Sequence, residues 1–415
     1  MSLELTNSQY KLEDICLQIT DGKHGDCENQ ENSGYYFVSV KDIDDGIIDY
    51  SNARQITKSD FEDTDKRTKL ENEDILITNS GTIGKFVFVN SPLSRKTTFQ
   101  KSVAIIKPNK NKIIPKFLYY YLISEKRRLI EYAGGTTQKN LLLRDIRNFE
   151  VDIPNESQQK KIIEILNNID QLISVNKKLN KNLEEQLLKI FDSWFFKFEL
   201  STEFIDSSLG LIPKGWSVDY LGSKKSCSII GSGINDFNHS KIYIATADVD
   251  NSIITNNETL ITFEDKPSRA NMQPVKKSIW FAKMIDSRKL IMVDDYCYEL
   301  LNNYIFSTGF CGLKCKDEYF YYLWTFLLSD TFDTIKNNFC TGTTMQAINN
   351  KDTKLIEYVL PDNELLSKFN NIAEPMYQEI YYNNLEINKL QKLRDTLLPK
   401  LMSGEIDVSK INCDL

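Results

Sequence analysis

The sequence predicts an α+β fold that is built twice, with two mixed α/β globular units separated by two long helices. The first observation is a run from Pro154 to Phe196 with no further Gly or Pro. Its apolar residues recur every three or four positions, as in a coiled coil: Ile165, Ile169, Leu172, Leu179, Leu183, Leu187, Ile190 and Trp194. The second is a like run that opens at Pro361, with the apolar face Leu365, Phe369, Ile372, Met376, Ile380, Ile387, Leu390, Leu393, Leu397 and Leu401. Pro375 lies inside this second run and predicts a kink or a break.

The third observation is an internal repeat with an offset of 207 residues, half of the 415-residue chain. Gly135-Thr136-Thr137 corresponds to Gly342-Thr343-Thr344, and Pro154 corresponds to Pro361. The chain is therefore a duplicated unit: a globular part, a polar Gly-Thr-Thr loop, a proline and a long helix. Two like units in one chain form a pseudo-dimer about a pseudo-twofold axis, so the two helices are expected to pair antiparallel.

A polar residue interrupts the apolar seam of each helix near its middle. Asn176 lies between Leu172 and Leu179, and its repeat partner Asn383 lies between Ile380 and Ile387. We expect these two amides to hydrogen-bond to each other and to fix the register of the helix pair. The alternative is that each faces solvent at the edge of the seam.

Domain boundaries follow from the repeat. We expect a first globular domain over 1–153, a central helix over 154–200, a second globular domain over 201–360 and a C-terminal helix over 361–405. Short β-branched and aromatic segments bounded by Gly, Asn or Pro predict strands early in each domain, and an aromatic helix follows late. Asp248-Val249-Asp250 occupies the place of Asp42-Ile43-Asp44, but the two domains otherwise diverge, so we expect a common helical frame that carries unlike heads.

Composition excludes several classes of protein. At 41% apolar and 26% charged residues, the chain is typical of a soluble globular protein, without a membrane-spanning run or a signal peptide at its start. Eight cysteines without paired spacing indicate reduced thiols and a cytoplasmic location. Cys311 and Cys315 have the spacing of half a metal site, but no second pair follows and the chain has only two histidines, so no metal is expected.

Charge is unevenly distributed along the chain. A net charge of −7 argues against binding nucleic acid through the bulk electrostatic field alone. Residues 75–150, however, hold 14 Lys and Arg against 4 Asp and Glu, whereas residues 1–74 hold 8 against 18. The basic block gives an anionic partner a place to bind, although a solvated basic surface is an alternative interpretation.

Two further motifs lead to a known family. The opening Ile212-Pro213-Lys214-Gly215-Trp216 and the ending Leu397-Leu398-Pro399-Lys400-Leu401-Met402-Ser403-Gly404-Glu405-Ile406, together with the Gly-Thr-Thr loops and the proline-initiated helices, resemble the specificity subunit of type I restriction–modification enzymes. The resemblance covers essentially the whole chain, although the first unit lacks the Ile-Pro-x-Gly-Trp opening.

The resemblance implies two target recognition domains, each binding one half of a bipartite, asymmetric site on double-stranded DNA. It also implies that the helices set the spacing and dock two methyltransferase (M) subunits, and that restriction (R) motor subunits complete the complex. S-adenosylmethionine, ATP and Mg are then expected on the partner subunits, with no cofactor in this chain.

No catalytic motif is evident in the chain. It has no adjacent prolines, as a base-methylating Asn/Asp-Pro-Pro motif requires, and no G-x-G-x-x-G. We therefore expect a non-enzymatic protein. Three alternatives remain: a nuclease with its own site near Asp250 and Glu264-Asp265-Lys266, the recognition subunit of a type IIB restriction system, and a coiled-coil adaptor.

Candidate DNA-binding residues are those that can read base edges or bind phosphate from polar loops. In the first unit they are Lys23, His24, Asn79, Ser80, Thr82, Lys85, Thr136, Thr137, Gln138 and Lys139; in the second they are Ser232, Asn235, Lys283, Arg288, Thr343, Thr344 and Gln346. Because the Gly-Thr-Thr loops match, we expect them to bind phosphate or cap a helix rather than read sequence. Tyr119, Tyr120 and Tyr121, on an apolar helix, are expected in the core.

Overall fold

The computed structural model describes residues 8–44, 46–134, 140–343 and 345–410. The chain forms two compact units, each discontinuous in sequence. The first comprises Met1–Ser174 and Ile387–Leu415, and the second comprises Val175–Glu386. Each unit therefore holds one globular head with its own segments of both long helices, so these boundaries divide the helices that the sequence analysis treated as separate domains.

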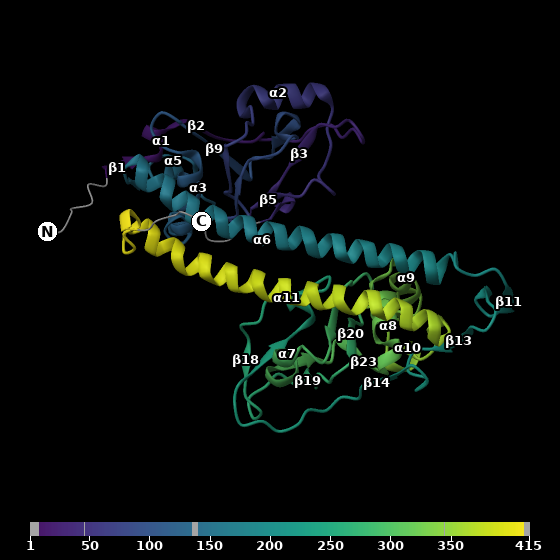
Figure 1. The fold of residues 1–415 in the computed structure, drawn as a ribbon. Coiled ribbons are helices and arrows are strands. Elements are labelled where there is room, and N and C mark those ends of the chain that lie inside the picture. Colours follow the sequence, from purple (N-terminus) through teal and green to yellow (C-terminus); the bar gives the residue numbers. More distant parts are fainter. Residues whose placement is uncertain (1–7, 45, 135–139, 344, 411–415) are drawn as a thin grey trace. The chain divides into compact units, whose positions relative to one another are not determined.

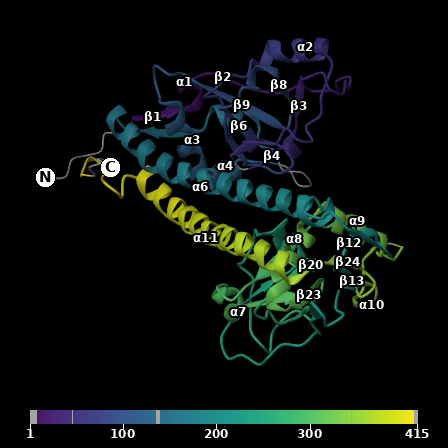
Figure 2. The same cartoon turned by 45° about the vertical axis from the view of Figure 1, so that its right-hand side comes forward.

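The head of the first unit is mixed α/β. Its elements are β1 (Ser8–Lys11), α1 (Leu12–Ile15), β2 (Cys16–Asp21), β3 (Tyr36–Val38), β4 (Ile43–Asp44), β5 (Ile47–Ile48), α2 (Lys58–Thr68), β6 (Ile75–Thr78), β7 (Phe86–Phe88), β8 (Thr97–Phe99), β9 (Val103–Pro108), α3 (Pro115–Ser124), α4 (Lys126–Glu131), α5 (Leu143–Arg147) and β10 (Glu150–Ile153). Strands β2, β9, β6 and β7 form an antiparallel sheet in that order, β3 pairs parallel with β8, and β1 pairs with β10. Helix α2 packs on β8 and β2 (Figure 2).

The head of the second unit has more strands. Its elements are β11 (Phe204–Ser207), β12 (Gly210–Pro213), β13 (Ser217–Tyr220), β14 (Cys227–Ile229), β15 (Lys241–Ile244), β16 (Val249–Asp250), β17 (Ile253–Ile254), β18 (Leu260–Ile261), β19 (Ala270–Met272), β20 (Ser278–Ala282), β21 (Leu290–Val293), α7 (Tyr298–Asn303), β22 (Tyr304–Ser307), β23 (Phe310–Cys315), α8 (Phe320–Leu328), α9 (Asp330–Asn338), α10 (Asn350–Thr353) and β24 (Glu357–Leu360).

The two heads share one strand topology. The sheet β14-β23-β20-β21 repeats the order β2-β9-β6-β7, the parallel pair β15–β22 repeats β3–β8, the hairpin β16–β17 repeats β4–β5, and β13–β24 repeats β1–β10. The expectation that only the helical frame is common was therefore wrong. Strand pairing depends on backbone hydrogen bonds and an alternating apolar face, which survive changes of side chain that hide the repeat in the sequence.

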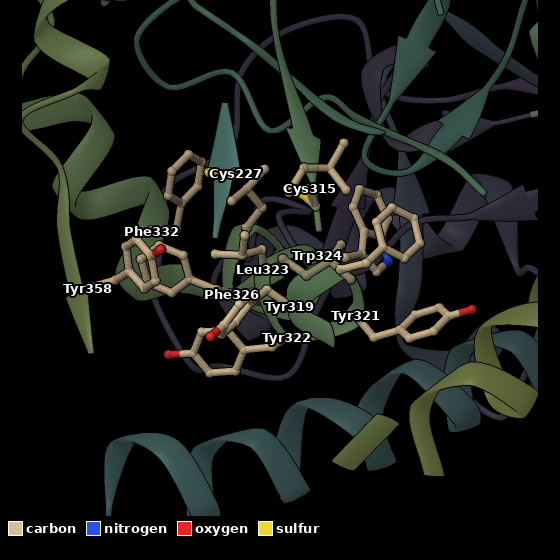
Figure 3. Packing of buried hydrophobic residues seen from close by; sticks show 14 of the residues in the cluster. Cys227, Cys315, Tyr319, Tyr321, Tyr322, Leu323, Trp324, Phe326, Phe332 and Tyr358 are labelled. Carbon is tan, nitrogen blue, oxygen red and sulfur yellow. The ribbon is translucent and has the colours of Figure 1, made fainter. Parts of the chain in front are cut away.

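Each head is closed by an aromatic helix, α3 in the first and α8 in the second. Tyr119, Tyr120 and Tyr121 of α3 are buried, as predicted. In the second unit the side chains of α8 gather with Phe332, Tyr358, Cys227 and Cys315 in one apolar cluster (Figure 3). These helices join the sheet of each head to the long helices, since Phe191 and Phe369 belong to the same cluster as α8.

The long helices are α6 (Glu156–Phe191), which continues as a π-helical turn over Asp192–Phe196, and α11 (Asn363–Met402) (Figure 1). Their starts are alike. The Asn155 side chain accepts the Gln158 N–H at 3.0 Å, and the Asp362 side chain accepts the Leu365 N–H at 2.9 Å, so both are capped directly after the repeated proline. Helix α11 runs through Pro375 without a break, so of the two outcomes expected there, a kink or a break, the break is wrong.

Within each unit the helix segments pair antiparallel, as predicted. In the first unit the Arg394 guanidinium donates to Asp170 at 3.2 Å, and in the second the Asn383 amide donates to Asn180 at 2.9 Å. The predicted seam was partly wrong, because Leu172 and Leu179 are 49% and 38% exposed. Of the predicted seam, Ile169 and Leu187 are buried, and the buried stripe also includes Ile162, Leu166, Ile173 and Phe191. It is rotated because α6 packs on a head as well as on α11: Ile162 and Leu166 belong to the core of the first head.

The predicted bond between Asn176 and Asn383 is also wrong. Asn176 donates to Glu386 at 3.0 Å, whereas Asn383 donates to Asn180, which in turn donates to Asn384 at 2.9 Å. In the hydrogen bonds that join a side chain of α6 to a side chain of α11, the two residue numbers add up to between 562 and 564, while those of Asn176 and Asn383 add up to 559. The two repeat partners thus lie about one helical turn out of register.

Candidate nucleic-acid interface

Backbone hydrogen bonds gather the predicted residues of the first head at one edge of its sheet. The Lys23 N–H donates to Phe99 O at 2.8 Å, the Asn79 N–H donates to Ser102 O at 3.0 Å, and the Leu141 N–H donates to Asn79 O at 2.8 Å. Ser80 bridges to Asn140, which exchanges two hydrogen bonds with Gly134. Segments from four parts of the sequence therefore meet where β2 and β6 end and β9 begins.

The Gly-Thr-Thr loop of the first head is attached at this edge. Gly134 and Asn140 close its base, with N···O distances of 3.1 and 2.8 Å. The predicted residues Thr136, Thr137, Gln138 and Lys139 lie outside the described residues. Their proposed contact with DNA stays a prediction.

Several predicted cations at this edge hold loops of the head in place. Lys23 forms ion pairs with Asp60 and Asp63 at 3.3 and 3.7 Å, and His24 contacts Asp21 at 3.1 Å. Lys85 donates to the Ile43 carbonyl oxygen at 2.7 Å. These side chains are already partnered, so contact with DNA would compete with bonds inside the head.

The neutral candidates differ in accessibility. Thr82 is exposed, Ser80 is half-buried, and Asn79 is only 8% exposed. The side-chain amide oxygen of Asn79 is buried and has no hydrogen-bond partner among the described residues. An unpaired buried acceptor is costly, and Asn79 lies three residues before the exposed Thr82.

The second head repeats this edge with other side chains. The Lys283 N–H donates to Gly309 O at 3.0 Å and the Ile348 N–H donates to Lys283 O at 2.9 Å, so Lys283 takes the place of Asn79. Met284 bridges to Ala347, as Ser80 bridges to Asn140. Thr341 and Ala347 close the second Gly-Thr-Thr loop, from which Thr343 and Gln346 are exposed, while Thr344 lies outside the described residues.

Arg288 has a structural role in the loop between β20 and β21. Its guanidinium contacts Asp330 at 2.6 Å and Asp333 at 3.6 Å and also donates to the Leu328 carbonyl oxygen. The buried Lys336 donates to the Ser287 carbonyl oxygen of the same loop at 2.8 Å. Burial lowers the pKa of Lys336, and the neighbouring Asp333 opposes that shift. These contacts fix the loop and leave Arg288 little freedom to read a base.

Ser232 and Asn235 are exposed beside a different strand. The Gly233 N–H donates to Asn271 O at 2.9 Å, which places their turn against β19. The Thr308 N–H donates to Arg269 O at 2.8 Å, so β19 lies near the edge that carries Lys283. The predicted residues of the second head therefore lie on loops at or near this edge, as far as the structure describes them. Among them, Arg288 is already paired with carboxylates of its own head.

Side chains that the sequence analysis did not single out also lie on these edges. In the first head they include Lys41, Gln100 and Lys101, and the Lys101 N–H bonds to Lys23 O at 3.1 Å. No motif marks them, because strand pairing alone brings Gln100 and Lys101 beside Lys23. Cys311 and Cys315 are buried in β23, and across the described part of the chain no group of three His, Cys, Asp or Glu is placed to hold a metal ion.

The described helices also include none that is long and apolar enough to span a membrane.

Comparisons with known proteins agree with this architecture. Residues 6–185 match the family model of the type I restriction modification DNA specificity domain. The chain is 28% identical over 359 residues to the type I restriction enzyme MjaIX specificity subunit of Methanocaldococcus jannaschii, covering 81% of this chain and 78% of that protein. It is 23% identical to the MjaVIII specificity subunit of the same organism, covering 97% and 93%. The crystal structure of a type I restriction–modification S subunit from M. genitalium shares the fold, with a TM-score of 0.51, 16% identity and 97% of both chains covered.

A DNA-specificity domain therefore matches the head of the first unit and most of α6, and the second head repeats the strand topology of the first. Over most of its length the chain is similar to specificity subunits of type I restriction–modification enzymes. The resemblance that its motifs carried is thereby confirmed. Its ending motif has a structural role, because Leu398 and Leu401 are buried in the core of the first unit with Ile162 and Leu166. In the opening motif, the Trp216 indole donates at 2.9 Å to Asp362, the residue that caps α11.

Proposed function

We propose that this chain selects the DNA target of a type I complex, with each head reading one half of a bipartite, asymmetric sequence. The observation that carries the proposal is the repeated edge: the same backbone bonds present Asn79 and Ser80 in one head and Lys283 and Met284 in the other. A common frame with unlike side chains suits two unlike half-targets. The paired helices would set the distance between the half-targets. The recognition subunit of a type IIB system would use the same geometry.

The helices are also the proposed docking surface for two M subunits. Beyond the faces that pack within each unit, apolar side chains remain in solvent. In the first unit they are Leu172 and Leu393, 49% and 46% exposed, and in the second they are Val175, Leu179 and Tyr382, 59%, 38% and 49% exposed. Exposed apolar groups that recur on a helix favour a protein partner. One M subunit for each unit follows from the duplication, and R subunits would complete a complex that acts in the cytoplasm.

Catalysis is assigned to the partners. We infer that S-adenosylmethionine, ATP and Mg bind to the M and R subunits and that this chain performs no chemistry. The residues of the alternative nuclease site do not favour it: Lys266 donates to Phe263 O at 2.9 Å and lies over the Phe263 ring at 4.2 Å. A purified chain that cleaved or methylated DNA alone would contradict this assignment.

The decisive experiment is the methylome of cells that express the chain with its M subunits. We expect a single bipartite motif with two unlike halves and a fixed spacer. Because the chain carries a net charge of −7, we also expect weak DNA binding alone and tight binding in the complex. Equal affinities with and without M subunits, or methylation of a continuous palindrome, would refute the proposed function.

A further inference from the structure

A hollow of about 310 Å³ lies in the first head, at the edge described above. Its lining includes Phe37, Ser39, Lys41, Asn52, Arg54 and Gln100. Gln100 follows β8, bridges to Lys23 and donates its N–H to Val38 O at 2.9 Å. The hollow is therefore continuous with the edge that carries Lys23 and Asn79.

Part of the lining is rigid. Phe37 is 3% exposed, and the Arg54 guanidinium lies 5.5 Å from the centre of its ring. Arg54 is also bonded to Asp26 at 2.5 Å and to the carbonyl oxygen of Cys27. Ser39 donates through its N–H and its hydroxyl to Asp42, at 2.8 and 2.9 Å. Arg54 and Asp42 thus shape the hollow and have little capacity left for a ligand.

Three other lining side chains keep donors or acceptors available. Lys41 is exposed, and its ammonium has no partner among the described residues. Asn52 is exposed, and within the described part of the chain its amide contacts only the adjacent Ser51 hydroxyl, at 3.4 Å. With the residues that the structure describes, the Gln100 side chain makes a single long contact, in which its carbonyl oxygen accepts from Ser102 at 3.5 Å. Lysine, asparagine and glutamine are the residue types that pair with guanine and adenine edges in the major groove.

The second head supplies an internal comparison. The strand that precedes the hollow continues into a short 3-10 turn in both heads, and Asp248 accepts the Ala245 N–H at 2.8 Å as Asp42 accepts that of Ser39. Along these matching segments Ser39 corresponds to Ala245 and Lys41 to Ala247. In the two parallel strand pairs Phe99 and Phe306 hold the same position, so the residues that follow them, Gln100 and Ser307, correspond. The frame is kept, while three side chains of the lining are replaced by smaller ones.

We propose that this hollow is a base-reading site of the first head, in which Lys41, Asn52 and Gln100 determine the bases accepted in one half-target. The site takes the edge of duplex DNA, and Arg54 acts as a positioning residue. The second head, with Ala245, Ala247 and Ser307 on the same frame, reads its half-target with other contacts. This inference rests on the proposed function and adds the residues that set specificity.

The test uses the full chain co-expressed with its M subunits. Lys41→Ala, Asn52→Ala, Gln100→Ala and the triple variant are compared with wild type by sequencing methylated DNA. Each good contact to a base edge is worth about 1–3 kcal/mol of discrimination, so a single variant should lose roughly 5- to 150-fold of its preference at one position. The relaxed positions should all fall in one half-target. Asn90→Ala is the matched control. Asn90 is exposed and follows the end of β7, whereas the start of β7 lies toward the edge that carries the hollow.

The outcomes separate the two proposals. If the wild type methylates no bipartite motif, the proposed function fails. If the wild type does so and the triple variant methylates the same motif at the same rate, the base-reading site fails alone. A uniform loss at all sequences, with a melting temperature unchanged from wild type, would assign the hollow to phosphate contact and overturn base reading.

Discussion

Asp170 joins three elements of the first unit, and its removal is the most informative stability test. One carboxylate oxygen accepts the Tyr120 hydroxyl of α3 at 2.6 Å, and the other accepts the Arg394 guanidinium of α11 at 3.2 Å. Tyr120 is 1% exposed, so Asp170→Ala leaves a buried hydroxyl without its acceptor and takes from Arg394 its partner on α6, leaving only the contact with the adjacent Asp395. We expect Asp170→Ala to destabilise the protein through both losses.

The magnitude follows from burial. Breaking a fully buried ion pair costs about 3–5 kcal/mol, but the Asp170 and Arg394 side chains are 28% and 33% exposed, which screens the charge. A hydrogen bond to a charged group contributes about 1.5–3 kcal/mol. We therefore expect a loss of about 2–3 kcal/mol, and for a unit of roughly 200 residues a melting temperature lowered by about 4–12 °C.

The assay is urea denaturation and calorimetry of the full chain, with Asn168→Ala as control. Asn168 is exposed on the same helix, so its replacement should stay within about 0.5 kcal/mol of wild type. Tyr120→Phe combined with Asp170→Ala should cost less than the sum of the single changes, because both remove one bond. A cost below 0.5 kcal/mol for Asp170→Ala, or strict additivity, would refute the reasoning.

Three further predictions concern the second unit. Burial raises the pKa of Glu184, although Arg288 and Ser252 oppose the shift, so the folded state resists ionisation of this carboxyl. The variant Glu184→Gln should therefore have a higher melting temperature than wild type at pH 7. This gain should vanish as the pH falls below the unfolded pKa of about 4.3, and melting curves recorded over a series of pH values test it. Asn180→Leu leaves the Asn383 amide buried without its acceptor and should lower the free energy of unfolding by about 1–3 kcal/mol. Asn182→Leu, at an exposed site of the same helix, is the control and should lower it far less. Equal losses for the two variants in urea denaturation would contradict this. Trp216→Phe removes the indole N–H that donates to Asp362, the residue that caps α11, and should lower the free energy of unfolding by about 0.5–1.5 kcal/mol. An unchanged unfolding free energy would show that this hydrogen bond is dispensable.

The long helices were predictable because their signals are local. A proline, a capping Asn or Asp and an uninterrupted period of three to four mark both starts, and the caps form as the sequence indicates. The face that is buried was less predictable. Leu172 and Leu179 fit the period, but they are exposed because α6 is shared between α11 and a head, which rotates the buried stripe to Ile169 and Ile173.

The sequence indicated which loops carry the candidate site, but it did not indicate which of their side chains are available to bind DNA. Lys23 and Arg288 are residue types that bind DNA, yet each is held by carboxylates distant in sequence, Asp60 and Asp330. Conversely, Lys41 and Gln100 carry no motif. Gln100 bridges to Lys23, and the pairing of β3 with β8, which links residues about 60 positions apart, brings the segments that carry Lys41 and Gln100 together.

The sequence by itself determined the duplication, the two helices, the antiparallel pairing and the resemblance to a known family, because repeated motifs and helical periodicity can be recognised without knowing any long-range contact. Only the tertiary structure decided that the heads share one topology, that Asn383 pairs with Asn180, and which polar side chains remain unpartnered at the edges. The physical reason is that register and side-chain partnership are set by long-range packing. A shift of one helical turn changes every partner between the helices while leaving the periodicity intact.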